Sequence, residues 1–124
     1  MKTKTVRRAG FTLVEIMIVV ALIGLLAAIV LPNYVRARSN SQAAACINNL
    51  RIIYDASQQW ALEYNKAPDT TVTFADIQSY LKNQVSCPAG GTNFLSNYEL
   101  HGVTNPPTCL FVPSAHIFVP TTTN

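Results

Sequence analysis

A single carboxylate stands inside the most apolar stretch of the chain. Glu15 is the only charged residue among the 21 residues from Phe11 to Leu31. An ionised side chain in hydrocarbon costs at least about 2.5 kcal/mol, so such a residue is by default functional and has a partner. The candidate partners are the lipid headgroup zone, another protein, or a positive charge created by processing. A cut after Gly10 would create that charge, because the new α-amino group of Phe11 lies about one helical turn from the glutamate of its own chain or of a neighbour.

Three cysteines and two histidines are the other residues with metal or redox chemistry. Cys46, Cys87 and Cys109 are separated by 40 and 21 residues, and no Cys-x-x-Cys pair occurs. Because structural zinc sites usually contain short ligand pairs, this spacing predicts no metal site. We expect His101 and His116 to be strand residues with surface or packing roles. In an oxidising compartment two of the three cysteines would pair and one would be left over.

The sequence contains no pattern of an enzyme or of a nucleic-acid-binding surface. It has no Gly-rich phosphate loop, zinc-hydrolase motif or nucleophile elbow. We therefore predict that the protein is not an enzyme and needs no cofactor. Four of the nine Lys and Arg lie in residues 1–10, which leaves five basic against six acidic residues elsewhere. Those five are scattered, so we expect no nucleic-acid binding by this subunit alone.

The apolar run predicts a helix over residues 11–32 that spans a membrane. As a helix, the 21 residues from Phe11 to Leu31 cover about 30 Å, the thickness of a bilayer core. Gly24 and Pro32 are expected to interrupt this helix, because proline lacks the backbone donor and clashes one turn back. The basic residues of segment 1–10 should stay cytoplasmic, so the rest of the chain should face outward from the membrane.

Beyond Pro32 the pattern becomes amphipathic, and we predict that the helix continues over residues 33–66 with one face against a small domain. The residues on the apolar arc are Ala43, Cys46, Ile47, Leu50, Ile53, Tyr54, Ser57, Trp60, Ala61 and Tyr64. The remaining residues, 67–124, suffice for one small domain. In it we expect a short helix from Phe74 to near Lys82, a turn at 87–91, and strands at 94–101, 108–112 and 117–119. The expected fold class is α+β.

The N-terminal stretch resembles the class III signal of type IV pilins and type II secretion pseudopilins. Its basic leader is carried by Lys2, Lys4, Arg7 and Arg8, and Gly10, Phe11 and Glu15 occupy the other positions of the pattern. The resemblance implies that residues 1–10 are a leader removed after Gly10 by a prepilin peptidase, which also N-methylates Phe11. It further implies a homo-oligomeric filament, built at an inner-membrane assembly platform. Glu15 would then pair with the Phe11 amine of a neighbouring subunit and set the register of assembly.

The C-terminal part is similar to the compact hairpin of many small pseudopilin-like proteins. The match is carried by Cys87, Pro88, Gly90, Gly91, Pro107, Cys109 and His116. We expect Cys87 and Cys109 to be bridged across this hairpin and Cys46 to remain a thiol on the apolar face of the long helix. The calcium-loop pattern expected of the major type II secretion pseudopilin is not present.

Several functions are compatible with these patterns. We favour a single-pass inner-membrane subunit of a type II secretion pseudopilus or a related filament, because the domain is small and its hairpin is pseudopilin-like. The first alternative is a type IV pilin for adhesion, motility or DNA uptake, in which the segment from Gly24 to Pro32 would unwind within the filament. The second is a monomeric membrane-anchored binding domain. An ordinary secretory signal fits less well, because its apolar core is only 7 to 15 residues long.

Overall fold

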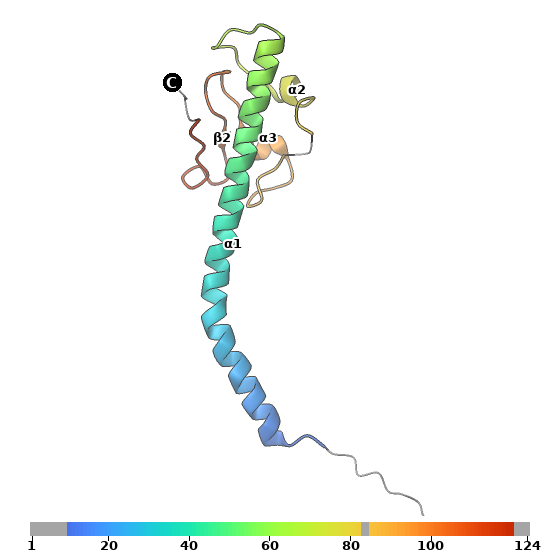
Figure 1. The fold of residues 1–124 in the computed structure, drawn as a ribbon, viewed down its shortest axis with the longest axis vertical. Coiled ribbons are helices and arrows are strands. Elements are labelled where there is room, and N and C mark those ends of the chain that lie inside the picture. The colour runs from blue at the N-terminus through green and yellow to red at the C-terminus, as the bar shows by residue number, and fades with distance from the viewer. Residues whose placement is uncertain (1–9, 83–84, 121–124) are drawn as a thin grey trace, which may run out of the picture. The chain divides into compact units, whose positions relative to one another are not determined.

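The computed structural model describes residues 10–82 and 85–120, so the basic leader residues and the C-terminal tail 121–124 lie outside the described part. Figure 1 shows the long helix α1 together with the short elements that follow it in the chain. The elements are α1 (Leu13–Glu63), α2 (Phe74–Ile77), α3 (Phe94–Asn97), β1 (Tyr98–Glu99) and β2 (Thr108–Cys109). The two strands form an antiparallel sheet in which Tyr98 pairs with Cys109 and Glu99 with Thr108. The predicted α+β fold class is confirmed.

Helix α1 continues through both residues that were expected to interrupt it. Gly24 lies within it, and Pro32 is an internal residue of the same 51-residue helix. The expectation of an interruption is therefore not met in the single chain. Proline removes one hydrogen bond of the ladder and leaves the others intact. The side-chain amide of Asn33 also donates to the carbonyl of Ile29 at 3.4 Å, just before the proline.

The long helix was predicted to continue to residue 66, but α1 ends at Glu63, and Asn65 sets this C-terminal end. Asn65 has a φ of 49°, and the backbone N–H of Lys66 donates to the carbonyl of Ala61 at 2.9 Å. This left-handed residue with a hydrogen bond spanning six residues is the Schellman arrangement that ends many helices. Proline follows it because it cannot continue a helix.

The chain forms two compact units, residues 1–37 and 38–124. In the second unit, α2, α3 and the sheet lie beside the C-terminal half of α1 (Figure 1). The face that α1 gives to this core is largely the predicted arc, with Cys46, Leu50, Ile53, Ala56, Ser57, Trp60 and Ala61 buried. The elements after α1 supply the rest of this core. In it the rings of Phe74 and Phe94 are in contact with centroids 4.4 Å apart, and Phe94 contacts Tyr98 at 5.4 Å. The small domain is thus built against one stripe of the helix.

The predicted strand over 94–101 is only partly correct. Residues Phe94–Asn97 form the helical turn α3, and only Tyr98 and Glu99 are in a strand. The side chain of Asn97 is 1% exposed and donates to the carbonyl of Gly91, which requires the chain to turn back on itself here. The second strand is also shorter than predicted, and residues 117–119 form no strand. The helix predicted over 74–82 is regular only as far as Ile77.

Gly90 and Gly91 lie in the turn after Cys87, and neither has a positive φ. At Gly90 the reason for glycine is a close approach, because an added Cβ would collide with the side-chain amide of Asn97. At Gly91 the nearest such atom is the Ser96 hydroxyl at 4.0 Å. Only the first of the two glycines is therefore required by packing.

Candidate functional site

The N-terminal unit presents its apolar side chains outward. From Leu13, which is 76% exposed, to Leu31, at 62%, the large hydrophobic residues of α1 have no cover within the chain. By length and composition, α1 is the one helix in the described residues that could cross a membrane. A helix that is apolar on all sides is stable only when lipid or other protein surrounds it. Such a surface fits a membrane-anchored subunit.

The predicted processing and assembly residues lie together at the start of this helix. Gly10 and Phe11 precede α1 and are exposed, Phe11 with 81% of its surface. Glu15 lies in the first turn of the helix. Its backbone N–H donates to the hydroxyl of Thr12 at 3.3 Å, which is the interaction of an N-cap residue. Sequence reasoning missed this role, although Thr12-Leu13-Val14-Glu15 has the spacing of a capping box.

The structure also gathers the three cysteines and His116 at one point in the domain core. The four ligand atoms all lie within 4.8 Å of one another, and all four residues are buried. The Cys87 and Cys109 sulfurs are 3.9 Å apart, and Nδ1 of His116 lies 3.6 Å from the first and 3.7 Å from the second. His101 is not part of this cluster, because its Nε2 contacts the hydroxyl of Thr108 at 3.3 Å.

Polar groups contact two of these sulfurs from outside the cluster. The Tyr98 hydroxyl lies 3.7 Å from the Cys46 sulfur and accepts a hydrogen bond from the amide of Asn49 at 3.2 Å. Burial raises the pKa of the Cys46 thiol well above its ordinary value, although the Tyr98 contact opposes this shift. Two effects on the Cys109 thiol act in opposite directions. Burial raises its pKa, whereas the backbone N–H groups of Val112 and Phe111 donate to the sulfur and lower it, and the net pKa lies below the ordinary value.

The cluster bears directly on two expectations from the sequence. All three cysteines are thiols in this structure, so the Cys87–Cys109 disulfide stays a prediction. No metal site was predicted, because the cysteines are far apart along the sequence. The fold nevertheless brings these residues together. Cys109 and His116, seven positions apart, gave the one local signal for such a cluster. His116 is buried as packing would require, but it lies in no strand.

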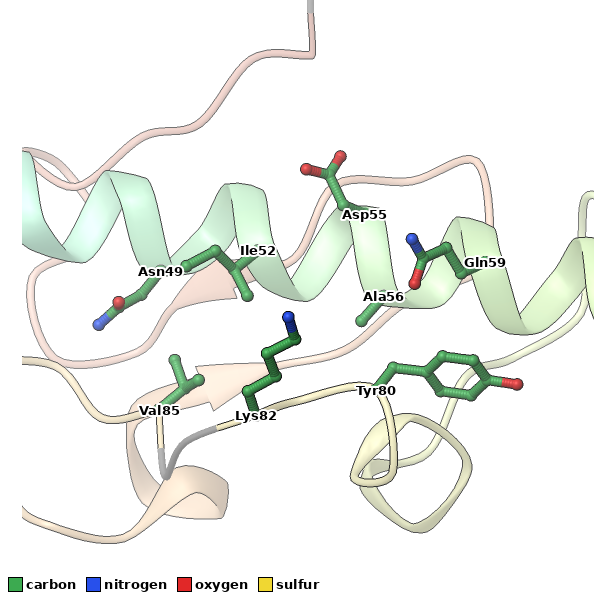
Figure 2. Close-up of a pocket in the computed structure, with 8 residues that line it drawn as sticks. All are labelled: Asn49, Ile52, Asp55, Ala56, Gln59, Tyr80, Lys82 and Val85. Carbon is green, nitrogen blue, oxygen red and sulfur yellow. The ribbon is translucent and has the colours of Figure 1, made fainter.

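A groove of about 480 Å³ lies between α1 and the segment around Lys82 (Figure 2). It is lined by Asn49, Ile52, Asp55, Ala56, Gln59, Tyr80, Lys82 and Val85. Figure 2 shows the Lys82 side chain extending toward α1, whereas the Asp55 carboxylate points away from it on the other side of the helix. The lining therefore offers no convergent acid and base with which to catalyse a reaction.

A long apolar helix that continues into a small α+β domain defines a pilin-like protein. Residues 6–31 match the family described as the Prokaryotic N-terminal methylation motif. The N-terminal segment thus carries the methylation motif that the sequence pattern predicted.

The relatives include a type IV pilin and type II secretion core proteins. The chain is 41% identical over 63 residues to the type IV major pilin protein PilA of Myxococcus xanthus, covering 51% of this chain and 29% of the pilin. It is 30% identical over 64 residues to the type II secretion system core protein G of Aeromonas hydrophila, covering 52% of this chain and 45% of that protein. A longer alignment, to core protein G of Escherichia coli, is 25% identical over 113 residues and covers 79% of this chain and 78% of the relative. No solved structure matches the chain.

The chain thus spans less than half the length of the first two relatives. These two alignments cover about half of this chain, and the alignment that covers more of it has the lower identity. These relatives are a pilin and secretion-system core proteins by name.

Proposed function

We propose that this protein is a structural subunit of a type II secretion pseudopilus or a related type IV pilus-like filament. A prepilin peptidase cuts the chain after Gly10 and methylates the new N-terminus at Phe11. The subunit then polymerises through its N-terminal helix, with Glu15 neutralising the Phe11 amine of a neighbour. It has no catalytic role of its own.

One observation carries this proposal. The helix matched by the methylation motif exposes apolar side chains along residues 13–31, and its single carboxylate lies in the first turn. In a membrane the lipid covers these side chains, and in a filament the helices of neighbouring subunits replace the lipid. In either environment the ionised carboxylate needs a positive charge beside it, and the processed N-terminus supplies this charge.

The partners and location follow from the same mechanism. Before assembly the subunit is a single-pass protein of the inner membrane with residues 33–124 outward, in contact with lipid, the peptidase and an assembly platform. After assembly its main partner is another copy of itself. Unwinding of the segment from Gly24 to Pro32 on assembly is part of this proposal, because glycine and proline have the lowest helix propensities.

A type IV pilin is the second candidate, and the 41% identity to a pilin over 63 residues favours it. The longer alignment to a secretion core protein and the small size of the domain favour the pseudopilus. Deletion of the gene separates the two functions. Loss of protein export supports the secretion role, whereas loss of twitching or of transformation with normal export supports the pilus.

Mass spectrometry of the mature protein tests the processing step. We expect an N-methylated Phe11 as the first residue, and we expect Gly10→Ala to leave the leader attached, because the added methyl group obstructs the peptidase. An N-terminus at Met1, or one beyond Pro32, contradicts the proposal. Sheared surface fractions then test assembly, since a monomeric anchored domain stays with the membrane.

A further inference from the structure

The cluster of Cys46, Cys87, Cys109 and His116 has no place in the filament mechanism. We propose that these four residues bind one zinc ion, which fixes the small C-terminal domain to helix α1. The site is independent of the proposed filament role, because all four ligands belong to the unit of residues 38–124.

The distances within the cluster fit a tetrahedron around a single ion. Zinc–sulfur bonds of about 2.3 Å and zinc–nitrogen bonds of about 2.0 Å give tetrahedral edges of roughly 3.8 Å between two sulfurs and roughly 3.6 Å between sulfur and nitrogen. The observed Cys87–Cys109 distance is 3.9 Å, and His116 Nδ1 lies 3.6 and 3.7 Å from these two sulfurs. Cys46 completes the set within 4.8 Å. An iron–sulfur cluster would hold its protein ligands farther apart than the edges around one metal ion.

The enclosure of the cluster indicates a structural site. The exposed fractions are 0% for Cys46, 2% for Cys87, 1% for Cys109 and 5% for His116. Four protein ligands satisfy zinc and leave no position for a water molecule or a substrate. Soft thiolates with one imidazole select zinc over magnesium, calcium or manganese, which prefer oxygen ligands.

Groups around the cluster are suited to three thiolates. Zinc binding releases three thiol protons, so three thiolates, a neutral imidazole and the dication together carry one negative charge. The backbone N–H groups of Val112 and Phe111 already point at the Cys109 sulfur. Because the Tyr98 hydroxyl accepts from Asn49, its own hydrogen is available to the Cys46 sulfur. Such outer contacts orient metal ligands and offset their charge.

The zinc site competes with the predicted disulfide for the same sulfur atoms. A Cys87–Cys109 bridge would involve only two of the four groups. It would not explain why the Cys46 thiol and the His116 imidazole are buried beside them. The metal uses all four. It also joins four segments that have little regular structure between them: the helix α1, the turn at 87–90, strand β2, and the loop that leads to His116. A domain of this size has a small core and gains stability from such a cross-link.

Metal content of the full-length protein tests the proposal. The protein is extracted in detergent from cells, anaerobically and without chelators, and its zinc is measured by elemental mass spectrometry against protein concentration. We expect about one zinc per chain. Exchange with Co²⁺ should give the intense sulfur-to-cobalt charge-transfer bands and the visible bands of a tetrahedral thiolate site. Removal of the ion with a strong chelator should lower the thermal midpoint, and added zinc should restore it.

Variants distinguish the four ligands from other residues. Cys87→Ser and His116→Asn should lose most of the bound zinc, whereas His101→Asn, which changes the histidine outside the cluster, should keep it. Because a ligand variant can fail to fold, His116→Cys serves as a second measurement. It preserves four ligands, so it should bind zinc and shift the cobalt bands toward those of a site with four sulfurs.

Two results would overturn the proposal. One is a chain that contains no zinc as isolated and in which non-reducing peptide mapping finds Cys87 bonded to Cys109. The other is bound zinc that survives His116→Asn with unchanged cobalt bands, because the ion then lies elsewhere.

Discussion

The backbone N–H of Glu15 donates to the Thr12 hydroxyl at 3.3 Å, at the start of a helix that is otherwise apolar for almost twenty residues. Glu15 therefore has a local explanation, because an acidic residue in the first turn also interacts favourably with the helix dipole. It has a second explanation as the partner of a neighbour's N-terminal amine. Substitutions can separate the two.

Glu15→Gln keeps a residue that suits a capping box and removes the charge. If the charge sets the assembly register, Glu15→Gln and Glu15→Leu should both insert in the membrane and be processed, yet fail to assemble. Loss of one member of a buried pair costs about 3 to 5 kcal/mol, which is ample to prevent polymerisation. The measurement is the ratio of sheared filament to membrane-bound subunit.

Glu15→Asp and Thr12→Val are the controls for this series. Glu15→Asp keeps the charge with a shorter reach, so its assembly should be intermediate. Thr12→Val removes the cap and leaves the carboxylate, so it should cost about 1 kcal/mol of helix stability and still assemble. Normal filaments from Glu15→Gln would assign the residue to capping alone.

The two adjacent glycines of the turn after Cys87 should respond differently to alanine. At Gly90 an added methyl group meets the buried Asn97 side chain, which is held by its hydrogen bond to the Gly91 carbonyl. We expect Gly90→Ala to destabilise the domain by about 1 to 3 kcal/mol, the usual cost of overpacking. Gly91→Ala should change stability by less than about 1 kcal/mol. Denaturation followed by the fluorescence of Trp60, the single tryptophan, measures the stability of both variants. Equal destabilisation by the two substitutions would contradict the close approach of Gly90 to the Asn97 side chain.

Asn65 should tolerate glycine better than alanine. Its φ of 49° is a left-handed conformation, which costs a residue with a Cβ about 1 to 2 kcal/mol, less for asparagine. Asn65→Ala is therefore expected to lower the free energy of unfolding by about 1 kcal/mol, whereas Asn65→Gly should leave it nearly unchanged. The same tryptophan signal reports the result. Equal stability of the alanine and glycine variants would show that this residue does not end the helix as described.

Asp76 should contribute to the loss of stability in acid. Hydrogen bonds from the Thr73 hydroxyl at 2.5 Å and the Thr73 backbone N–H at 2.9 Å hold the pKa of its carboxyl below the ordinary value. A depressed pKa means that the stabilisation is fully present above the unfolded value, near pH 4, and is lost as pH falls through the folded value. Asp76→Asn should therefore lower the stability at pH 7 and flatten its decline below about pH 4. Denaturation of the parent and of the Asp76→Asn variant at a series of pH values, followed by the fluorescence of Trp60, measures both effects.

The sequence by itself determined the N-terminal half of this protein. An apolar run with one carboxylate and a glycine junction predicts a helix and its exposed surface, because helix formation depends on neighbours three and four residues away. The amphipathic arc likewise predicted most of the face that α1 buries, from Cys46 to Ala61. The local cap at Thr12 was overlooked there, although its spacing was visible, and the interruption expected at Gly24 and Pro32 does not occur in the single chain.

Only the tertiary structure decided the rest of the domain. The turn of Phe94–Asn97 was read as strand because its apolar residues suit either element, and the buried hydrogen bond of Asn97 that selects the turn comes from a neighbouring loop. In the same way, Cys46, Cys87 and His116 lie far apart along the chain, and packing of three segments on α1 brings their ligand atoms within 4.8 Å. Contacts of this kind join residues separated by 29 to 70 positions, and no local pattern records them.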